Sequence, residues 1–269
     1  MLRRNVTRAL LVVLALVALV PADATAAAPD TVFLEELTWT EVRARVGGGA
    51  TLVIVPIGGT EQNGPHMAIG KHNVRARALA ERVARTLGGA LVAPVIAYVP
   101  EGDLAPPSGH MRFPGTISVP DDTFRRTLEA AARSLRLAGF RHVVFLGDHG
   151  STQAGEKAVA AKLTREWAGT RARVVAVEEY YRAATAGFRG LLRSRGYGPE
   201  ELGEHADLAD TSLTLALAPD LVRTAGVEAA PSGPSGADGD ARRASAELGR
   251  LGVELIVSRT VAAIKESTR

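Results

Sequence analysis

The sequence has no cysteine among its 269 residues, which excludes a disulfide framework and a lipoprotein-type attachment site. Any metal site must therefore use histidine and carboxylate ligands. Aromatic residues make up only 4% of the chain, and no basic cluster is interleaved with aromatics as a nucleic-acid surface requires. The net charge is +3, from 32 basic and 29 acidic residues that are dispersed along the chain. Nucleic acid is therefore a poor candidate as a partner.

Several well-known catalytic motifs are also missing. The sequence has no H-E-x-x-H zinc motif, no P-loop and no G-x-S-x-G nucleophile motif. The pair Gly58-Gly59 is not followed by the G-x-G-x-x-G pattern of a dinucleotide site. Ser108 precedes Gly109-His110, but adjacent positions do not establish a catalytic triad. No internal repeat and no clear linker divides the chain, which predicts a single domain.

The N-terminus has the order of residues that directs a protein to export. Arginines at positions 3 and 4 precede an apolar run over residues 9–20, and a small-residue stretch follows. This order is typical of a secretory signal peptide, and the run is short for a transmembrane helix, which needs about 20 residues. We expect residues 1–26 to be the signal and residues 27–269 to form one domain. An uncleaved membrane anchor is the alternative.

The rest of the chain alternates between two patterns. Continuous β-branched or apolar runs, expected to be strands of a buried parallel sheet, cover residues 51–57, 91–99, 142–146 and 174–177. Amphipathic or capped stretches, expected to be helices, cover residues 34–46, 74–87, 122–138, 152–168, 188–195 and 241–265, with another helix ending near residue 217. Polar loops are expected over residues 101–115 and 226–240. This alternation predicts an α/β fold with a mostly parallel central sheet.

A Gly- and Pro-rich loop follows the first predicted strand and carries Glu61, His66 and His72. Ordering a backbone costs about 1–2 kcal/mol per residue, and polar groups gathered in such a loop need partners when they are buried. A metal ion would supply these partners. A polar turn without a metal is the alternative that the residue types leave open.

A second histidine lies at a similar junction, because His149 follows the strand predicted over residues 142–146. Ligands of open α/β sheets bind at the carboxyl ends of the strands, where Glu61, His72 and His149 can meet. Two histidines and one carboxylate suit a catalytic Zn²⁺ with an open position for water, or Mn²⁺ or Fe²⁺. Such an ion activates water and polarises a carbonyl oxygen, which is the chemistry of amide hydrolysis.

Four segments, in order, resemble the creatininase family (creatinine amidohydrolase and relatives). Pro56 to His66 is similar to the family pattern of proline, a hydrophobic residue and Gly-Ser-x-Glu-Gln-His-Gly-Pro-His. Residues 113–118 match its FPGTIS segment, residues 147–150 its NGHGG loop, and residues 205–212 its HAG-x-x-ETS segment. The resemblance implies a three-layer α/β/α sandwich and a hydrolase of cyclic amides or other amides. It also implies divalent metals and a hexamer.

The resemblance also implies an altered metal site. In well-studied relatives two metals share an aspartate, and a histidine two residues after the glutamate binds the second metal. These positions hold His72 and Asn63 here, and Ser151 takes the place of a further carboxylate of creatininase. An imidazole offers one lone pair and cannot bridge two ions, so we expect one ion, bound by Glu61, His72 and His149.

Other residues receive roles only through the resemblance. His205 is expected to be the general acid and base, and Asp210 a fourth ligand or a residue that orients an imidazole. From the residue types alone, Asp207 and Asp210 are either a ligand pair or a helix N-cap and its third residue. His66 and His110 are expected to line the pocket, unless they only hold the loops by hydrogen bonds. The residues that could rebuild a second metal site are Asn63, Asp148 and Asp210.

These patterns together predict an exported, metal-dependent hydrolase that cleaves a C–N bond in a small cyclic or linear amide. The expected cofactor is one Zn²⁺ or Mn²⁺ per chain, and the expected assembly is a homo-oligomer without nucleic acid, free of the membrane once the signal is removed. One alternative is a non-catalytic protein that binds a small ligand in the same pocket. Another is a metal-dependent lyase or isomerase acting on a sugar derivative.

Overall fold

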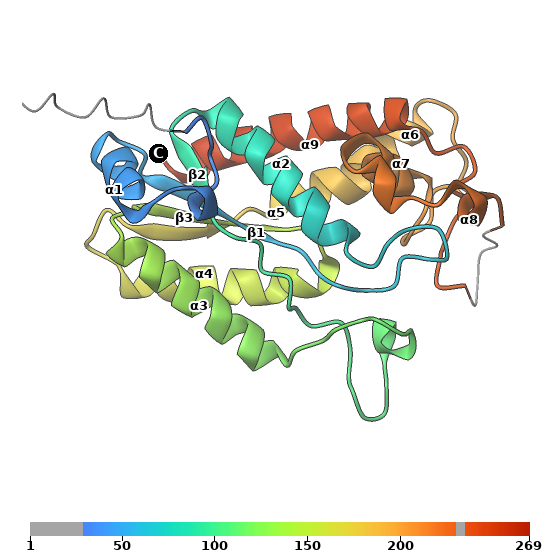
Figure 1. The fold of residues 1–269 in the computed structure, drawn as a ribbon, viewed down its shortest axis with the longest axis horizontal. Coiled ribbons are helices and arrows are strands. Elements are labelled where there is room, and N and C mark those ends of the chain that lie inside the picture. The colour runs from blue at the N-terminus through green and yellow to red at the C-terminus, as the bar shows by residue number, and fades with distance from the viewer. Residues whose placement is uncertain (1–28, 230–234) are drawn as a thin grey trace, which may run out of the picture.

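The computed structural model describes residues 29–229 and 235–269, so the predicted signal over residues 1–26 lies outside the described residues. A parallel sheet lies at the centre, with strand order β2-β1-β3-β4 (Figure 1). The strands are β1 (Leu52–Ile57), β2 (Ala90–Val92), β3 (His142–Gly147) and β4 (Arg173–Ala176). Within the described ranges, no helix has the length and apolar character needed to cross a membrane.

Helices cover both faces of the sheet (Figure 1). The helices are α2 (Lys71–Leu87) and α9 (Ala246–Ser267) on one face, and α3 (Asp121–Leu137) and α4 (Gln153–Glu166) on the other. Successive side chains of a strand point to opposite faces. Ile54 of β1 therefore packs in one core with Leu79 of α2, while Val55 packs in the other with Phe124 of α3. The predicted three-layer α/β/α sandwich is confirmed.

Shorter elements complete the chain. They are α1 (Trp39–Gly47), α5 (Glu178–Arg182), a π-helical segment (Ala183–Gly187), α6 (Phe188–Arg193), α7 (Leu208–Leu217) and α8 (Thr224–Ala229). Short 3-10 turns lie at Leu34–Glu36, Gly109–Arg112, Gly150–Thr152 and Pro219–Leu221. Helix α7 packs against α9 and also contacts α2, which places it beside the loop that leaves β1.

Several elements differ from the sequence-based expectation. Strand β2 ends at Val92 because Pro94 has no N–H to donate, and the following chain forms only isolated bridges with the sheet. The helix expected over residues 188–195 begins at Glu178, because α5, the π-helical segment and α6 are continuous. Helix α8 lies partly inside the loop expected over residues 226–240. Thr38 caps α1 in a capping box with Glu41.

Helix α2 begins at Lys71, earlier than the expected residue 74, and this places His72 in its first turn. The loop after β1 lies against this turn, since the Gly59 N–H donates to Asn73 Oδ1 at 3.0 Å. A Cβ atom on Gly58 would lie 2.1 Å from Asn73 Oδ1 and 2.8 Å from Asn73 Cα. Only glycine fits so close to another backbone, so Gly58 fixes the loop against α2.

A long segment between β2 and α3, residues 101–117, projects from the body of the molecule (Figure 1, green). We call this segment the arm. Its end is tied to the loop after β1, because Ile117 N donates to Thr60 O at 2.9 Å. At its start Glu101 N donates to Ser118 Oγ at 3.0 Å. The two ends of the arm therefore lie at the same edge of the sheet as the loop after β1.

Candidate metal centre

Glu61 and His149 leave neighbouring strands and meet at the carboxyl edge of the sheet. Ile57 of β1 pairs in register with Gly147 of β3, so the two loops start from the same level. Nε2 of His149 lies 2.8 Å from Oε2 of Glu61, and Glu61 is fully buried. The structure thus brings together one carboxylate and one imidazole of the expected metal site.

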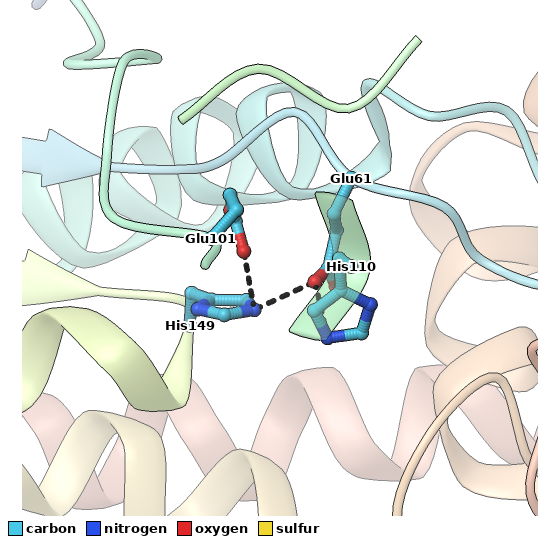
Figure 2. Close-up of side chains that lie close together, drawn as sticks. All are labelled: Glu61, Glu101, His110 and His149. Atoms are coloured by element: carbon cyan, nitrogen blue, oxygen red, sulfur yellow. Dashed lines mark hydrogen bonds and ion pairs between the residues drawn. The ribbon is translucent and has the colours of Figure 1, made fainter. Parts of the chain in front are cut away.

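The arm adds a carboxylate and an imidazole at the same point (Figure 2). Oε2 of Glu101 lies 3.2 Å from Nε2 of His149, and Nε2 of His110 lies 2.9 Å from Oε2 of Glu61. One possible ligand atom from each of these four residues lies within 4.8 Å of the others. Sequence reasoning missed Glu101, because no motif contains it. The only available signal was its position at the start of a long polar loop.

The surroundings of Glu101 show whether the cluster fits a cation. Its side chain is 4% exposed, and neither carboxylate oxygen has a hydrogen-bond partner in the described part of the chain. Burial, together with the neighbouring Glu61 carboxylate, raises the pKa of Glu101 to about 9. Two buried carboxylates this close cannot both ionise without a counter-charge. A divalent cation between them would supply that charge and bind the unpaired oxygens, so the residues fit a metal ion.

The hydrogen bonds of His149 point to the same conclusion. Nδ1 of His149 lies 2.6 Å from the Ser151 hydroxyl, which donates to Pro100 O at 2.5 Å, and Nδ1 also accepts from the Ser151 N–H at 3.2 Å. Nε2 of the same ring faces the carboxylates of Glu61 and Glu101. Burial lowers the pKa of His149, so the ring is neutral and has a lone pair that a metal ion can use.

His72 lies on the opposite side of Glu61, between two carboxylates. Its Nδ1 is 2.6 Å from Oδ2 of Asp148, and its Nε2 is 2.8 Å from Oε1 of Glu61. Although burial opposes ionisation, the Arg75 guanidinium holds the pKa of Asp148 below its usual range. Asp148 therefore accepts the Nδ1–H of His72, an arrangement typical of an oriented metal ligand. That His72 binds the ion stays a prediction, and the structure places Asp148 behind His72.

Two buried cations stand beside the cluster, and sequence reasoning missed both. Lys71 and Arg75 are 1% and 4% exposed, and each forms an ion pair with Asp210. Arg75 also donates to Asp148 at 2.8 Å. Both cations lie in a stretch that has the sequence pattern of an amphipathic surface helix. Asp210 is therefore occupied by cations and does not join the four-residue cluster, and Asp148 is likewise held by Arg75.

The turn before α7 positions His205. Asp207 is the N-cap of α7 and accepts from Asp210 N at 2.7 Å, which decides between the two readings of this aspartate pair. Ala206 has a positive φ of 54°, a conformation that costs a non-glycine residue about 1 kcal/mol, and its N–H donates to Asp210 Oδ2 at 3.1 Å. This turn places Nδ1 of His205 3.8 Å from Oε1 of Glu61. Burial and the nearby Lys71 lower the pKa of His205 to about 4.

The remaining predicted site residues are engaged elsewhere. Nε2 of His66 lies 3.0 Å from the Thr211 hydroxyl, and Asn63 donates from Nδ2 to the main-chain oxygens of Glu61 and Ala68. Ser151 is held between His149 and the main chain, as described above. The side chains at these positions hold loops together in the described structure.

A cavity of about 310 Å³ opens onto the cluster. Its walls include Glu61, His72, His110, His149 and His205, together with Lys71 and Tyr181. The volume is at the small end of the range for ligand sites. The cavity therefore suits a small molecule that meets the carboxylates and histidines directly.

The fold and this cavity define a class: an α/β/α protein with a carboxylate and histidine centre that fits a divalent cation. The family model named Creatininase, described as creatinine amidohydrolase, matches residues 35–264. The chain therefore belongs to the creatininase family, a family of hydrolases.

Individual relatives agree with this assignment. The chain is 33% identical over 195 residues to a creatinine amidohydrolase of Pseudomonas putida, across 71% of this chain and 74% of that protein. It is 27% identical over 197 residues to a 3-dehydro-scyllo-inosose hydrolase of Thermotoga maritima, across 72% of this chain and 58% of that protein. A solved structure described as manganese creatininase superposes with a TM-score of 0.71 at 29% identity, covering 88% of this chain and 99% of that one.

Proposed function

We propose that this protein hydrolyses a C–N bond in a small cyclic or linear amide, with one Zn²⁺ or Mn²⁺ held at Glu61 and His149. The observation that carries the proposal is Glu101, a buried carboxylate with no hydrogen-bond partner in the described chain, beside Glu61 and Nε2 of His149. Nitrogen and oxygen donors of this kind suit either ion. The name of the Pseudomonas putida relative and the manganese in the related structure support the reaction class and the metal.

The charges around the cavity support one ion rather than two. Lys71 and Arg75 already neutralise Asp210 and Asp148. Asn63 is neutral, and its Nδ2 donates within its own loop. Glu61 and Glu101 are left as the carboxylates that require an added cation, and a single divalent ion balances both.

Each side chain at the site has a separate role in the proposed amide hydrolysis. A bound divalent cation would acidify water and polarise the amide carbonyl. His205 presents Nδ1 to the cavity near Glu61, where it accepts the proton of the attacking water and returns it to the leaving nitrogen. Asp148 holds His72, and His72 in turn holds Oε1 of Glu61 in place. The small cavity keeps the substrate close to these groups.

The N-terminal sequence supports a second part of the proposal, that the protein is exported. Residues 1–26 have the composition of a signal peptide, and the chain has no cysteine to be oxidised outside the cell. Mass spectrometry of the protein recovered from its native host would show a mature N-terminus near residue 27. A chain that retains residues 1–26 in the membrane fraction would contradict export with cleavage.

The reaction is tested by a screen of small cyclic and linear amides, beginning with creatinine, against zinc-loaded, manganese-loaded and chelator-treated protein. We expect release of the amine or ring-opened product only from the metal-loaded protein. A Glu61→Gln variant should lose turnover, while a variant of an exposed arm residue, Asp103→Asn, should keep it. Metal-loaded protein that binds an amide without turnover would favour the ligand-binding alternative. Turnover of a cyclic polyol ketone instead of amides would overturn the assignment of the bond.

A further inference from the structure

The orientation of the Gln62 side chain is fixed by main-chain groups. Its Oε1 accepts from the N–H of Gly64 at 2.9 Å, and its Nε2 donates to the carbonyl oxygen of Gly236 at 2.9 Å. A main-chain N–H can only donate and a carbonyl can only accept. Exchanging the oxygen and nitrogen of this amide would break both bonds, so its donor and acceptor atoms are assigned by their partners.

This orientation determines which nitrogen of His110 carries a proton. The Nε2 atom of Gln62 also lies 3.1 Å from Nδ1 of His110. An amide nitrogen can only donate, so Nδ1 of His110 must accept. A neutral imidazole that accepts at Nδ1 has its proton on Nε2. That Nε2–H points at Oε2 of Glu61, 2.9 Å away.

The main chain of the same glutamine determines the tautomer of His205, which is again the Nε2–H form, but on a ring that turns its other nitrogen to Glu61. Nε2 of His205 lies 2.9 Å from the carbonyl oxygen of Gln62, so Nε2 carries the proton and donates. The lone pair of the neutral ring is then on Nδ1, which faces Oε1 of Glu61 at 3.8 Å. The two rings are neighbours in the cavity wall, with centroids 4.7 Å apart.

We propose that Gln62 is a positioning residue that fixes the Nε2–H tautomer in two adjacent histidines of different orientation, so that His205 presents a proton-accepting Nδ1 to the cavity and His110 directs an N–H donor to Glu61. The side-chain amide acts on His110 and the main-chain carbonyl acts on His205. A substrate in the cavity then meets a proton acceptor at Nδ1 of His205, which suits an amide, since its N–H needs an acceptor.

The assignment also removes His110 from the set of metal ligands. A histidine binds a metal through a lone pair, and the Gln62 amide leaves the lone pair of His110 on Nδ1, turned away from Glu61. His149 and His72 also turn Nε2 to Glu61, but their Nδ1 atoms face Ser151 and Asp148. The amide donor at Nδ1 therefore distinguishes His110 from these two histidines.

The experiment is a long-range proton–nitrogen correlation spectrum of the zinc-loaded full chain, labelled with isotopic nitrogen in histidine. Single His→Gln variants assign the rings. We expect a protonated Nε2 and an unprotonated Nδ1 in both His110 and His205. A His110 ring protonated at Nδ1, or bonded to zinc at Nε2, would overturn the assignment.

A Gln62→Met variant tests the role of Gln62 itself. Methionine removes the amide donor but keeps the main-chain carbonyl, so the nitrogen signals of His110 should change while those of His205 stay the same. A change in both rings, or in neither, would overturn the proposal. In parallel, His110→Gln should keep the zinc content of the wild type and His149→Gln should lose it. The tautomers can be established without any turnover, and only their use in catalysis rests on the proposed function.

Discussion

A buried glutamate in helix α4 allows the stability of the fold to be tested separately from the chemistry of the site. Glu156 of α4 is 2% exposed, and its Oε1 has no hydrogen-bond partner in the described residues. This oxygen lies against the end of β3, because a Cβ atom on Gly147 would be only 1.9 Å from it. Burial raises the pKa of Glu156 from its ordinary value of 4.5 to about 7.

The sign and size of the effect follow from the raised pKa. The folded protein holds the proton of Glu156 more tightly than the unfolded chain, so the stabilisation is complete below pH 4.5 and is lost as the pH rises through about 7. At about 1.4 kcal/mol per pKa unit, ionised Glu156 costs roughly 3 kcal/mol of stability at high pH. About 2.5 kcal/mol of this cost develops between pH 5 and pH 8.

The perturbation is Glu156→Gln, which keeps the shape of the side chain and removes its titration. Urea unfolding of wild type and variant at pH 5 and pH 8, with the same metal loading in every sample, cancels the contribution of other groups. The variant should gain about 2.5 kcal/mol relative to wild type between the two pH values. Glu166→Gln, at an exposed position of the same helix, should show no such gain. Equal pH dependence in wild type and Glu156→Gln would refute the reasoning.

Two further predictions concern the loop and the arm that build the site. Gly58→Ala should destabilise the protein by roughly 1–3 kcal/mol in urea unfolding, because the new Cβ would lie 2.8 Å from the backbone of Asn73. The matched control is Gly70→Ala, which has open space around its Cβ position. Equal losses of stability in the two variants would contradict the steric argument. Glu101→Gln should weaken zinc binding by about tenfold or more in calorimetric titration. A control variant at an exposed residue of the arm, Asp103→Asn, should leave the zinc affinity unchanged. An unchanged zinc affinity in Glu101→Gln would show that Glu101 lies outside the site.

The sheet could be predicted from the sequence because its signals are local. The apolar runs of β1 and β3 and the glycines after them mark two strand ends, and parallel pairing then places Glu61 near His149. The capping box of α1 is also encoded within four neighbouring residues. The helix beginning at Glu178 was harder to predict, because the π-helical segment interrupts the regular 3.6-residue spacing on which such predictions rest.

The electrostatics of the site could not be predicted, because they depend on partners far apart in the chain. Lys71 pairs with Asp210, 139 residues away, and Arg75 pairs with Asp148, 73 residues away. Without those partners a lysine and an arginine in an amphipathic helix are expected to face water. Glu101 belongs to the same category, since only the folded arm brings it against His149. The resemblance to a family identified the loops, and the structure supplied these neighbours.

The central claim is that Glu61 and His149, with Glu101 beside them, hold one divalent cation that the reaction requires. Elemental analysis of the purified, extensively dialysed protein tests it most directly, with Glu61→Gln measured alongside. We expect about one zinc or manganese ion per chain in the wild type, and loss of that ion in the variant. Protein that is folded, carries no divalent metal and does not take up zinc on titration would contradict it.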